Sequence, residues 1–118
     1  MNCKLRPIDV LFSQILRKKR GYRSEICGIY YPDGKGLQCS HFWGRRHENT
    51  RFDEDNCDIL NFAEHQRFEE NPAEYTEWKK KRLGAKKFKD LMIRANLFCK
   101  RDDKKIMLFL KEFYKEFI

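Results

Sequence analysis

The chain has 118 residues, 37% of them charged, and its formal net charge at pH 7 is +8. This length accommodates one compact domain. Its longest apolar run, Ile106–Leu110, is far too short to cross a membrane, so no membrane association is expected. A basic chain of this size attracts polyanions, and nucleic acid is the commonest of these.

The cysteines favour a reducing environment. They are five in number and irregularly spaced, whereas a secreted disulfide scaffold normally has an even and denser set. They are Cys3, Cys27, Cys39, Cys57 and Cys99. The N-terminal stretch has no apolar signal core, and its basic, amphipathic pattern also suits a mitochondrial presequence. We therefore expect an intracellular protein, and the sequence leaves nuclear and mitochondrial locations open.

The first half of the chain is expected to contain one helix, a hairpin and a short strand. Apolar residues recur at helical spacing between Pro7 and Lys19, and Gly21 should end that helix. Two strand-favouring runs flank the turn cluster PDGKG, which predicts a β-hairpin over Ile26–Phe42. Residues 43–55 are predicted to form a loop, followed by a strand at Cys57–Leu60.

The second half is expected to be helical, over about residues 62–70, 72–84, 88–98 and 106–117. The sequence thus predicts a single α+β domain spanning residues 1–118. Its parts are an N-terminal helix (7–19), a core (about 22–71) and a C-terminal helical region (about 72–118).

The segment CSHFWGRRHENTRFDEDNCDILNFAEHQRFEENPAEY joins several recognisable pieces: His-Phe-x-x-Arg, Thr-Arg-x-Asp-x-x-Asn and Asn-Pro-x-Glu. It resembles the HNH (ββα-metal) nucleases, and more narrowly the phage NinG-type recombination endonucleases. His41 and Asn56 are 15 residues apart, and Asn56 precedes His65 by nine. The resemblance covers about residues 22–84 and implies a small ββα-metal core, flanked here by helices at both ends.

The resemblance implies a catalytic role for His41 as general base and for Asn56 as the residue that orients it. A neutral imidazole suits the removal of a proton from water at neutral pH. His65 and Glu69 lie four residues apart on one helical face and are the expected ligands of one Mg²⁺ or Mn²⁺ ion. Glu70 or Asn71 would be alternatives to Glu69.

Basic residues are the expected contacts to DNA. Arg45, Arg46 and Arg51 lie in the loop between the base and the metal helix, and guanidinium groups match phosphate oxygens. We expect Arg45 and Arg51 to assist catalysis as well. The stretch KKKRLGAKKFK predicts a second basic surface. It includes Lys79, Lys80, Lys81, Arg82, Lys86 and Lys87.

Two departures from the family pattern are evident. Ser40 stands where many HNH enzymes place a metal ligand. The positions of a structural zinc site carry Ser24, Cys27, Asn61 and Glu64, so only one thiolate of four remains and no structural zinc is expected. Helix packing would replace it, through the apolar faces of the first and last helices. These faces are Leu11, Phe12 and Ile15, and Phe109, Phe113 and Phe117.

The function that these patterns favour is divalent-metal-dependent hydrolysis of DNA by an HNH endonuclease, with branched recombination intermediates as a candidate substrate. A homodimer would suit cleavage of both strands, although the sequence does not fix the oligomeric state. One alternative is a non-catalytic nucleic-acid-binding module that retains the HNH fold. Another is a protein-binding role for the Phe-rich C-terminal helix.

Overall fold

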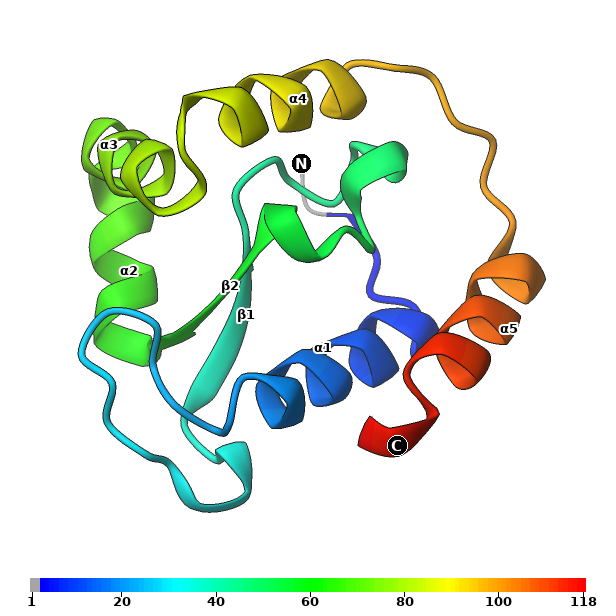
Figure 1. The fold of residues 1–118 in the computed structure, drawn as a ribbon, viewed down its shortest axis with the longest axis horizontal. Coiled ribbons are helices and arrows are strands. Elements are labelled where there is room, and N and C mark those ends of the chain that lie inside the picture. Colours follow the sequence, from blue (N-terminus) through cyan, green and yellow to red (C-terminus); the bar gives the residue numbers. More distant parts are fainter. Residues whose placement is uncertain (1–2) are drawn as a thin grey trace.

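A computed structural model describes residues 3–118 and gives an α+β fold (Figure 1). Within these residues one two-stranded antiparallel sheet is surrounded by five α-helices. The helices are α1 (Pro7–Lys19), α2 (Phe62–Glu70), α3 (Pro72–Leu83), α4 (Ala85–Ala95) and α5 (Asp103–Phe113), and the strands are β1 (Leu37–His41) and β2 (Cys57–Asn61). The coarse prediction of fold class is confirmed.

The sheet pairs strands from either side of the long loop. Leu37 lies opposite Asn61 and His41 lies opposite Cys57. The intervening residues contain two short 3₁₀ turns, Glu48–Thr50 and Glu54–Asn56, and no further strand. Helix α2 starts directly after β2, capped by Asn61. The order is therefore strand, long loop, strand, helix.

The predicted hairpin over Ile26–Phe42 is wrong in its first half. Only β1 is a strand there, and residues before it form a single isolated bridge between Arg23 and Tyr30. The backbone turns back at once, because the Ser24 hydroxyl accepts hydrogen bonds from the amides of Ile26 and Cys27. The side chains of Ile26, Ile29 and Tyr30 stay exposed, although Tyr31 packs partly against the core. The segment therefore has no continuous buried face that would place it in the sheet.

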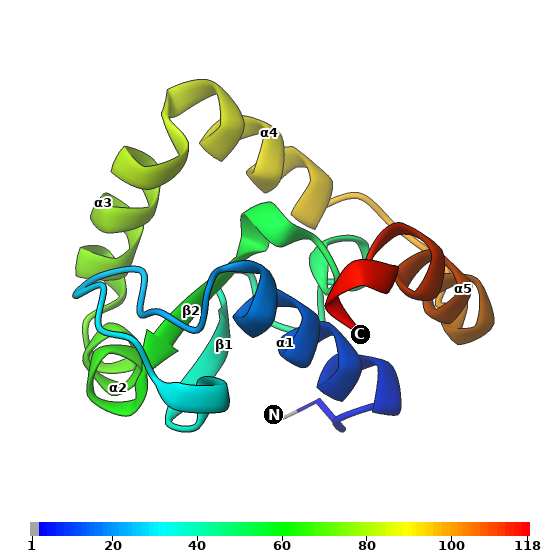
Figure 2. The same cartoon turned by 60° about the horizontal axis from the view of Figure 1, so that its bottom comes forward.

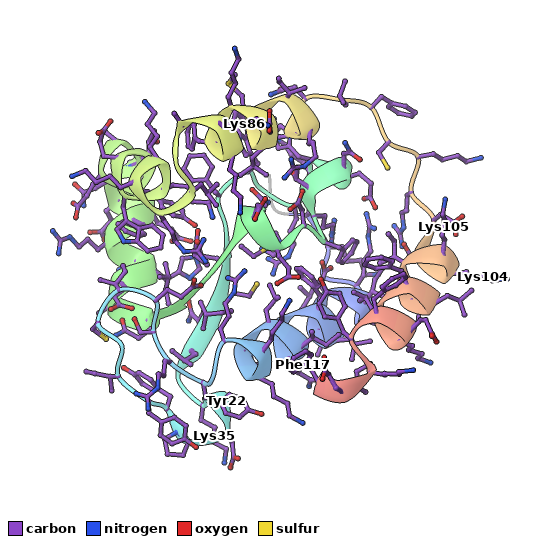
Figure 3. All side chains as sticks on the ribbon, viewed as in Figure 1. Tyr22, Lys35, Lys86, Lys104, Lys105 and Phe117 are labelled. Atoms are coloured by element: carbon purple, nitrogen blue, oxygen red, sulfur yellow. The ribbon has the colours of Figure 1, made fainter. Side chains whose placement is uncertain are left out.

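One face of the sheet packs on α1, and α5 lies against α1 and adds Leu110 to the same core (Figures 1 and 2). This core consists of apolar side chains and two thiols: Phe12, Ile15, Leu16, Leu37, Cys39, Cys57, Ile59 and Leu110. Phe117 packs against this cluster beside α1 (Figure 3). Each large apolar side chain buried here contributes about 1.5–3 kcal/mol to folding.

The prediction for the last helix needs correction. Leu110 is its fully buried residue, whereas Phe109 and Phe113 are exposed and pack on each other with ring centroids 4.7 Å apart. The helix starts at Asp103, three residues earlier than its apolar periodicity predicts. The earlier start does not alter which residues share a face of the helix. Leu110 is buried because its side of α5 packs on α1.

The opposite face of the sheet packs on α2 and α3 through Leu60, Phe68 and Tyr75. Helix α4 covers the loop between the strands and starts at Ala85, after Gly84 with a φ of 84°. No helix within residues 3–118 combines the length and apolarity that a membrane crossing requires.

Candidate functional site

His41 lies at the end of β1, and the long loop fixes its imidazole. Its Nε2 donates a hydrogen bond to the carbonyl oxygen of Arg51 at 2.9 Å. Its Nδ1 is buried and has no hydrogen-bond partner among residues 3–118. Because a carbonyl can only accept, this arrangement places the ring proton on Nε2 and leaves the lone pair on Nδ1.

Burial keeps this imidazole neutral. Desolvation, assisted by the positive charge of Arg45, lowers the pKa of His41 from 6.5 to about 4. A neutral ring at pH 7 has a basic nitrogen available, which is what a general base requires.

Arg51, whose carbonyl oxygen accepts the hydrogen bond from His41, is itself fixed by a contact with α1. The Arg51 guanidinium is buried and donates to Asp9, with Nε 2.9 Å from Oδ1. The contact with Arg51 and a backbone amide bond from Arg6 outweigh desolvation and lower the pKa of Asp9. Helix α1 lies outside the segment that resembles a nuclease, yet it supplies this support. In the sequence, the charged residue Asp9 lies among apolar positions of α1, and this pattern indicates a buried charge with a partner of opposite sign.

Asn56 is buried and ties the two ends of the loop together. Its side chain donates to the carbonyl oxygens of Trp43 and Thr50 and accepts from the amide of Trp43 at 2.8 Å. Asn56 therefore bonds to the loop backbone. The resemblance had implied instead that it orients the imidazole of His41. Its effect on His41 is indirect, through the loop that carries the carbonyl of Arg51.

His65 and Glu69 lie together on α2. Nε2 of His65 is 3.4 Å from Oε1 of Glu69, and Nδ1 of His65 is hydrogen bonded to the side-chain oxygen of Gln38 on β1. That bond places the proton on Nδ1 and leaves Nε2 free to bind a cation. An outer-shell partner of this kind is what orients histidine ligands in metal sites. The sequence alone did not reveal Gln38, whose role depends on how α2 crosses the strand.

These groups share one hollow of about 430 Å³. It brings His41 together with His65, Glu69 and two of the predicted arginines, Arg45 and Arg46. Cys3, Cys39 and Gly44 also line it. A second hollow of about 520 Å³ adjoins it, shares His41, His65 and Glu69, and is otherwise largely aromatic.

Three predicted phosphate contacts do not fit this structure and are revised. Arg51 is buried against Asp9, and Lys79 is fully buried with its Nζ 2.8 Å from Oδ1 of Asp58. Arg82 is engaged as well, with Asp58 at 2.8 Å and with Glu25. These side chains serve the fold. The remaining members of the second basic surface are exposed: Lys80, Lys81, Lys86 and Lys87 (Lys86 is labelled in Figure 3).

The hydroxyl of Ser40 is not free to act as a metal ligand beside His65. Its hydroxyl is 3.1 Å from the hydroxyl of Tyr75, which donates to Asp58 at 2.6 Å. Desolvation and the Asp58 carboxylate raise the pKa of Tyr75, so it remains a hydrogen-bond donor. The strand therefore contributes no ligand at this position.

The four positions expected to correspond to a structural zinc site lie together in space. The hydroxyl of Ser24 donates to Glu64 at 2.6 Å, and Nδ2 of Asn61 is 4.0 Å from the Cys27 sulfur. Asn61 and Glu64 also cap α2 reciprocally. Hydrogen bonds thus join this turn to the start of α2, where a tetrahedral ion would do so in a four-cysteine site.

The structure also assembles a donor cluster that spacing did not suggest. The sulfurs of Cys39 and Cys57 and a ring nitrogen of His41 all lie within 4.8 Å of one another, and this cluster could hold a metal ion. In the sequence, Cys39 and His41 alternate on one strand, but the proximity of Cys57 depends on the strand register.

The loop around these residues is anchored to α4. His47 bonds through Nδ1 to the carbonyl oxygen of Ala95 at 2.9 Å, so it is a structural contact and not only a solvated side chain. Asp53 also anchors the loop, through Arg94 at 2.8 Å.

Comparisons of the chain with protein-family models, with curated proteins and with solved structures found no match.

Proposed function

We propose that this protein is a divalent-metal-dependent endonuclease that hydrolyses phosphodiester bonds in DNA. The observation that carries the proposal is the state of His41: a neutral imidazole with a buried, unpartnered Nδ1, in a residue that lines the same hollow as the His65–Glu69 pair. A base and a cation-binding pair beside arginines are the groups that phosphodiester hydrolysis needs.

Each group has a defined task in this proposal. Nδ1 of His41 takes a proton from the attacking water, and the Arg51 carbonyl stabilises the resulting imidazolium through Nε2. His65 and Glu69 hold Mg²⁺ or Mn²⁺, which offsets negative charge on the phosphate and the leaving oxygen. Arg45 and Arg46 contact phosphates of the backbone.

The topology is consistent with the HNH resemblance. A strand ending in the base, a long loop, a second strand and a helix bearing the cation-binding pair follow one another in the order of a ββα-metal core. The clustering of Ser24, Cys27, Asn61 and Glu64 gives independent support, because the resemblance alone assigned them to one site. A branched recombination intermediate is the substrate that the narrower resemblance suggests.

One observation favours a non-catalytic nucleic-acid-binding module instead. Nδ1 of His41 is covered, so the loop must shift for water to reach the base. In that case the exposed lysines of α3 and α4 would bind nucleic acid without cutting it.

A cleavage assay separates the two functions. The purified protein would be incubated with supercoiled, linear and four-way-junction DNA in Mg²⁺, in Mn²⁺ and in EDTA. We expect strand scission that EDTA abolishes and that the double variant H65A/E69A reduces strongly. DNA binding without scission of any substrate in either metal would establish the binding module and contradict the nuclease.

The control variant carries the same kind of double change on a neighbouring face of α2. Gln66 and Glu70 are exposed, and their side chains bond to each other at 3.3 Å. The double variant Q66A/E70A should retain metal-dependent scission. Equal loss in both double variants would place the cation elsewhere.

A further inference from the structure

Two buried thiols lie beside the candidate base. Cys39 and Cys57 come from neighbouring strands and point to the same face of the sheet as His41, since His41 and Cys57 are paired in register. One ligand atom from each residue lies within 4.8 Å of the other two. The proposed nuclease mechanism uses His41 and gives neither thiol a role.

We propose that Cys39, His41 and Cys57 form a binding site for one thiophilic divalent cation, Zn²⁺ or Cd²⁺, and that occupation of this site switches off the proposed nuclease. The binding site stands on the geometry of the three residues. The inhibition rests on the proposed function. Nε2 of His41 donates to the Arg51 carbonyl, so a cation would bind at Nδ1 and remove the lone pair that would accept the proton from water.

The ligand chemistry suits a soft cation. Thiolate sulfur and imidazole nitrogen are preferred by Zn²⁺ and its heavier relatives, whereas Mg²⁺ and Mn²⁺ prefer oxygen. In a tetrahedral site with Zn–S bonds of about 2.3 Å, two sulfurs would be about 3.8 Å apart. The two sulfurs, which lie within 4.8 Å of each other, therefore need to approach by at most about 1 Å, and small rotations about their χ1 angles supply this movement.

Charge balance also fits a buried position. Each thiol releases its proton to solvent as its sulfur binds, so two thiolates and a neutral imidazole balance the charge of a divalent ion. The buried site then has no net charge, which limits the cost of desolvation. Burial raises the pKa of the Cys57 thiol, so this thiol keeps its proton in the absence of a cation.

The cluster borders the hollow described above. Cys39 and His41 line the hollow that contains His65 and Glu69, whereas Cys57 is fully buried behind them. A cation can enter from this hollow, and a water molecule there would complete its coordination. The buried, unpartnered Nδ1 of His41 is a second, independent sign of a ligand-binding site.

Cobalt binding tests the site without reference to cleavage. The reduced full-length protein would be titrated with Co²⁺, and thiolate-to-cobalt charge-transfer absorption would be followed in the near ultraviolet. We expect saturation at one ion per chain and displacement by Zn²⁺. C39A and C57A should each weaken binding by more than the 10–100-fold typical of a lost outer-shell partner.

Two exposed cysteines provide matched controls. Cys99 lies in the segment between α4 and α5, and Cys3 lies in the same hollow but outside the cluster. C99A and C3A should bind cobalt as the parent does. Because C57A empties a buried position, its thermal midpoint would be checked, and C39A gives the same test at a site next to the hollow. Absence of the thiolate band, or its survival in both C39A and C57A, would overturn the site.

The inhibition has its own readout. In an active preparation with excess Mg²⁺, one equivalent of Zn²⁺ should abolish scission by the parent and C99A but leave most of the activity of C39A. Cobalt binding with undiminished scission in stoichiometric Zn²⁺ would contradict the switch and leave the binding site intact. A protein that binds cobalt but never cleaves DNA would refute the nuclease, and the switch with it.

Discussion

The two faces of the small sheet differ in how completely their polar side chains are hydrogen bonded and ion paired. Towards α3, Ser40 and Asp58 join a closed network with Tyr75, Lys79 and Arg82 in which every charge has a partner. Towards α1, His41 keeps an unpartnered nitrogen beside two free thiols. Saturated polar groups fix a structure, whereas unsatisfied ones remain available for chemistry. The comparison therefore assigns stability to one face and reactivity to the other.

The largest expected effect is on catalysis by the α1 face. H41A should lower scission by about 10²–10⁴-fold, the contribution typical of a general base. DNA affinity should change little, because the side chain lies mostly below the surface. Single-turnover cleavage with saturating enzyme would measure the rate, and filter binding the affinity. A variant that cuts at the parental rate would move the reactive group elsewhere.

The largest expected effect on stability concerns the α3 face. K79A should lower the free energy of unfolding by about 3 kcal/mol, near the lower end for breaking a buried ion pair, because Arg82 and Tyr75 still contact Asp58. Urea unfolding would measure it. The neighbouring exposed lysine supplies the control, since K80A should cost less than about 0.5 kcal/mol. Similar losses in both variants would mean that the network does not stabilise the fold.

A third test uses pH on the metal-free protein. Burial lowers the pKa of His41 to about 4 in the folded state, against 6.5 when the chain is unfolded. Between these values the unfolded chain binds more protons, so stability should fall as pH is lowered from about 6.5 to about 4. Urea midpoints in EDTA would show this slope. H41Q should flatten it, and a parental curve that is level over this window would show that His41 is not desolvated.

The smallest effect expected is on binding to the exposed surface. Replacing Lys86 and Lys87 with Gln should weaken DNA binding equally for all sequences. It should also make the slope of log K against log salt concentration shallower by about 0.9 for each lost phosphate contact. The matched control replaces Lys104 and Lys105, which are equally exposed but lie at the start of α5 (Figure 3). Equal salt slopes for the two variants would mean that binding does not distinguish these surfaces.

The sequence by itself determined the elements that depend on local pattern. Apolar spacing, Pro7 and Pro72 at helix starts, and Gly84 after α3 placed the bounds of α1 and α3 within a residue, because propensity and capping act over a few neighbouring positions. The spacing of His41, His65 and Glu69 likewise selected residues that the structure places in one hollow.

Only the tertiary structure decided which charged side chains face solvent. Lys79 and Lys80 are indistinguishable in a basic run, yet one is fully buried and the other exposed, since the docking of α3 on β2 selects a single face. The same holds for Arg51, which Asp9 of α1 turns inward, and for the approach of Cys57 to Cys39 and His41, which follows from strand register. Local sequence patterns do not predict such contacts between distant residues, because these contacts form only when the elements pack together.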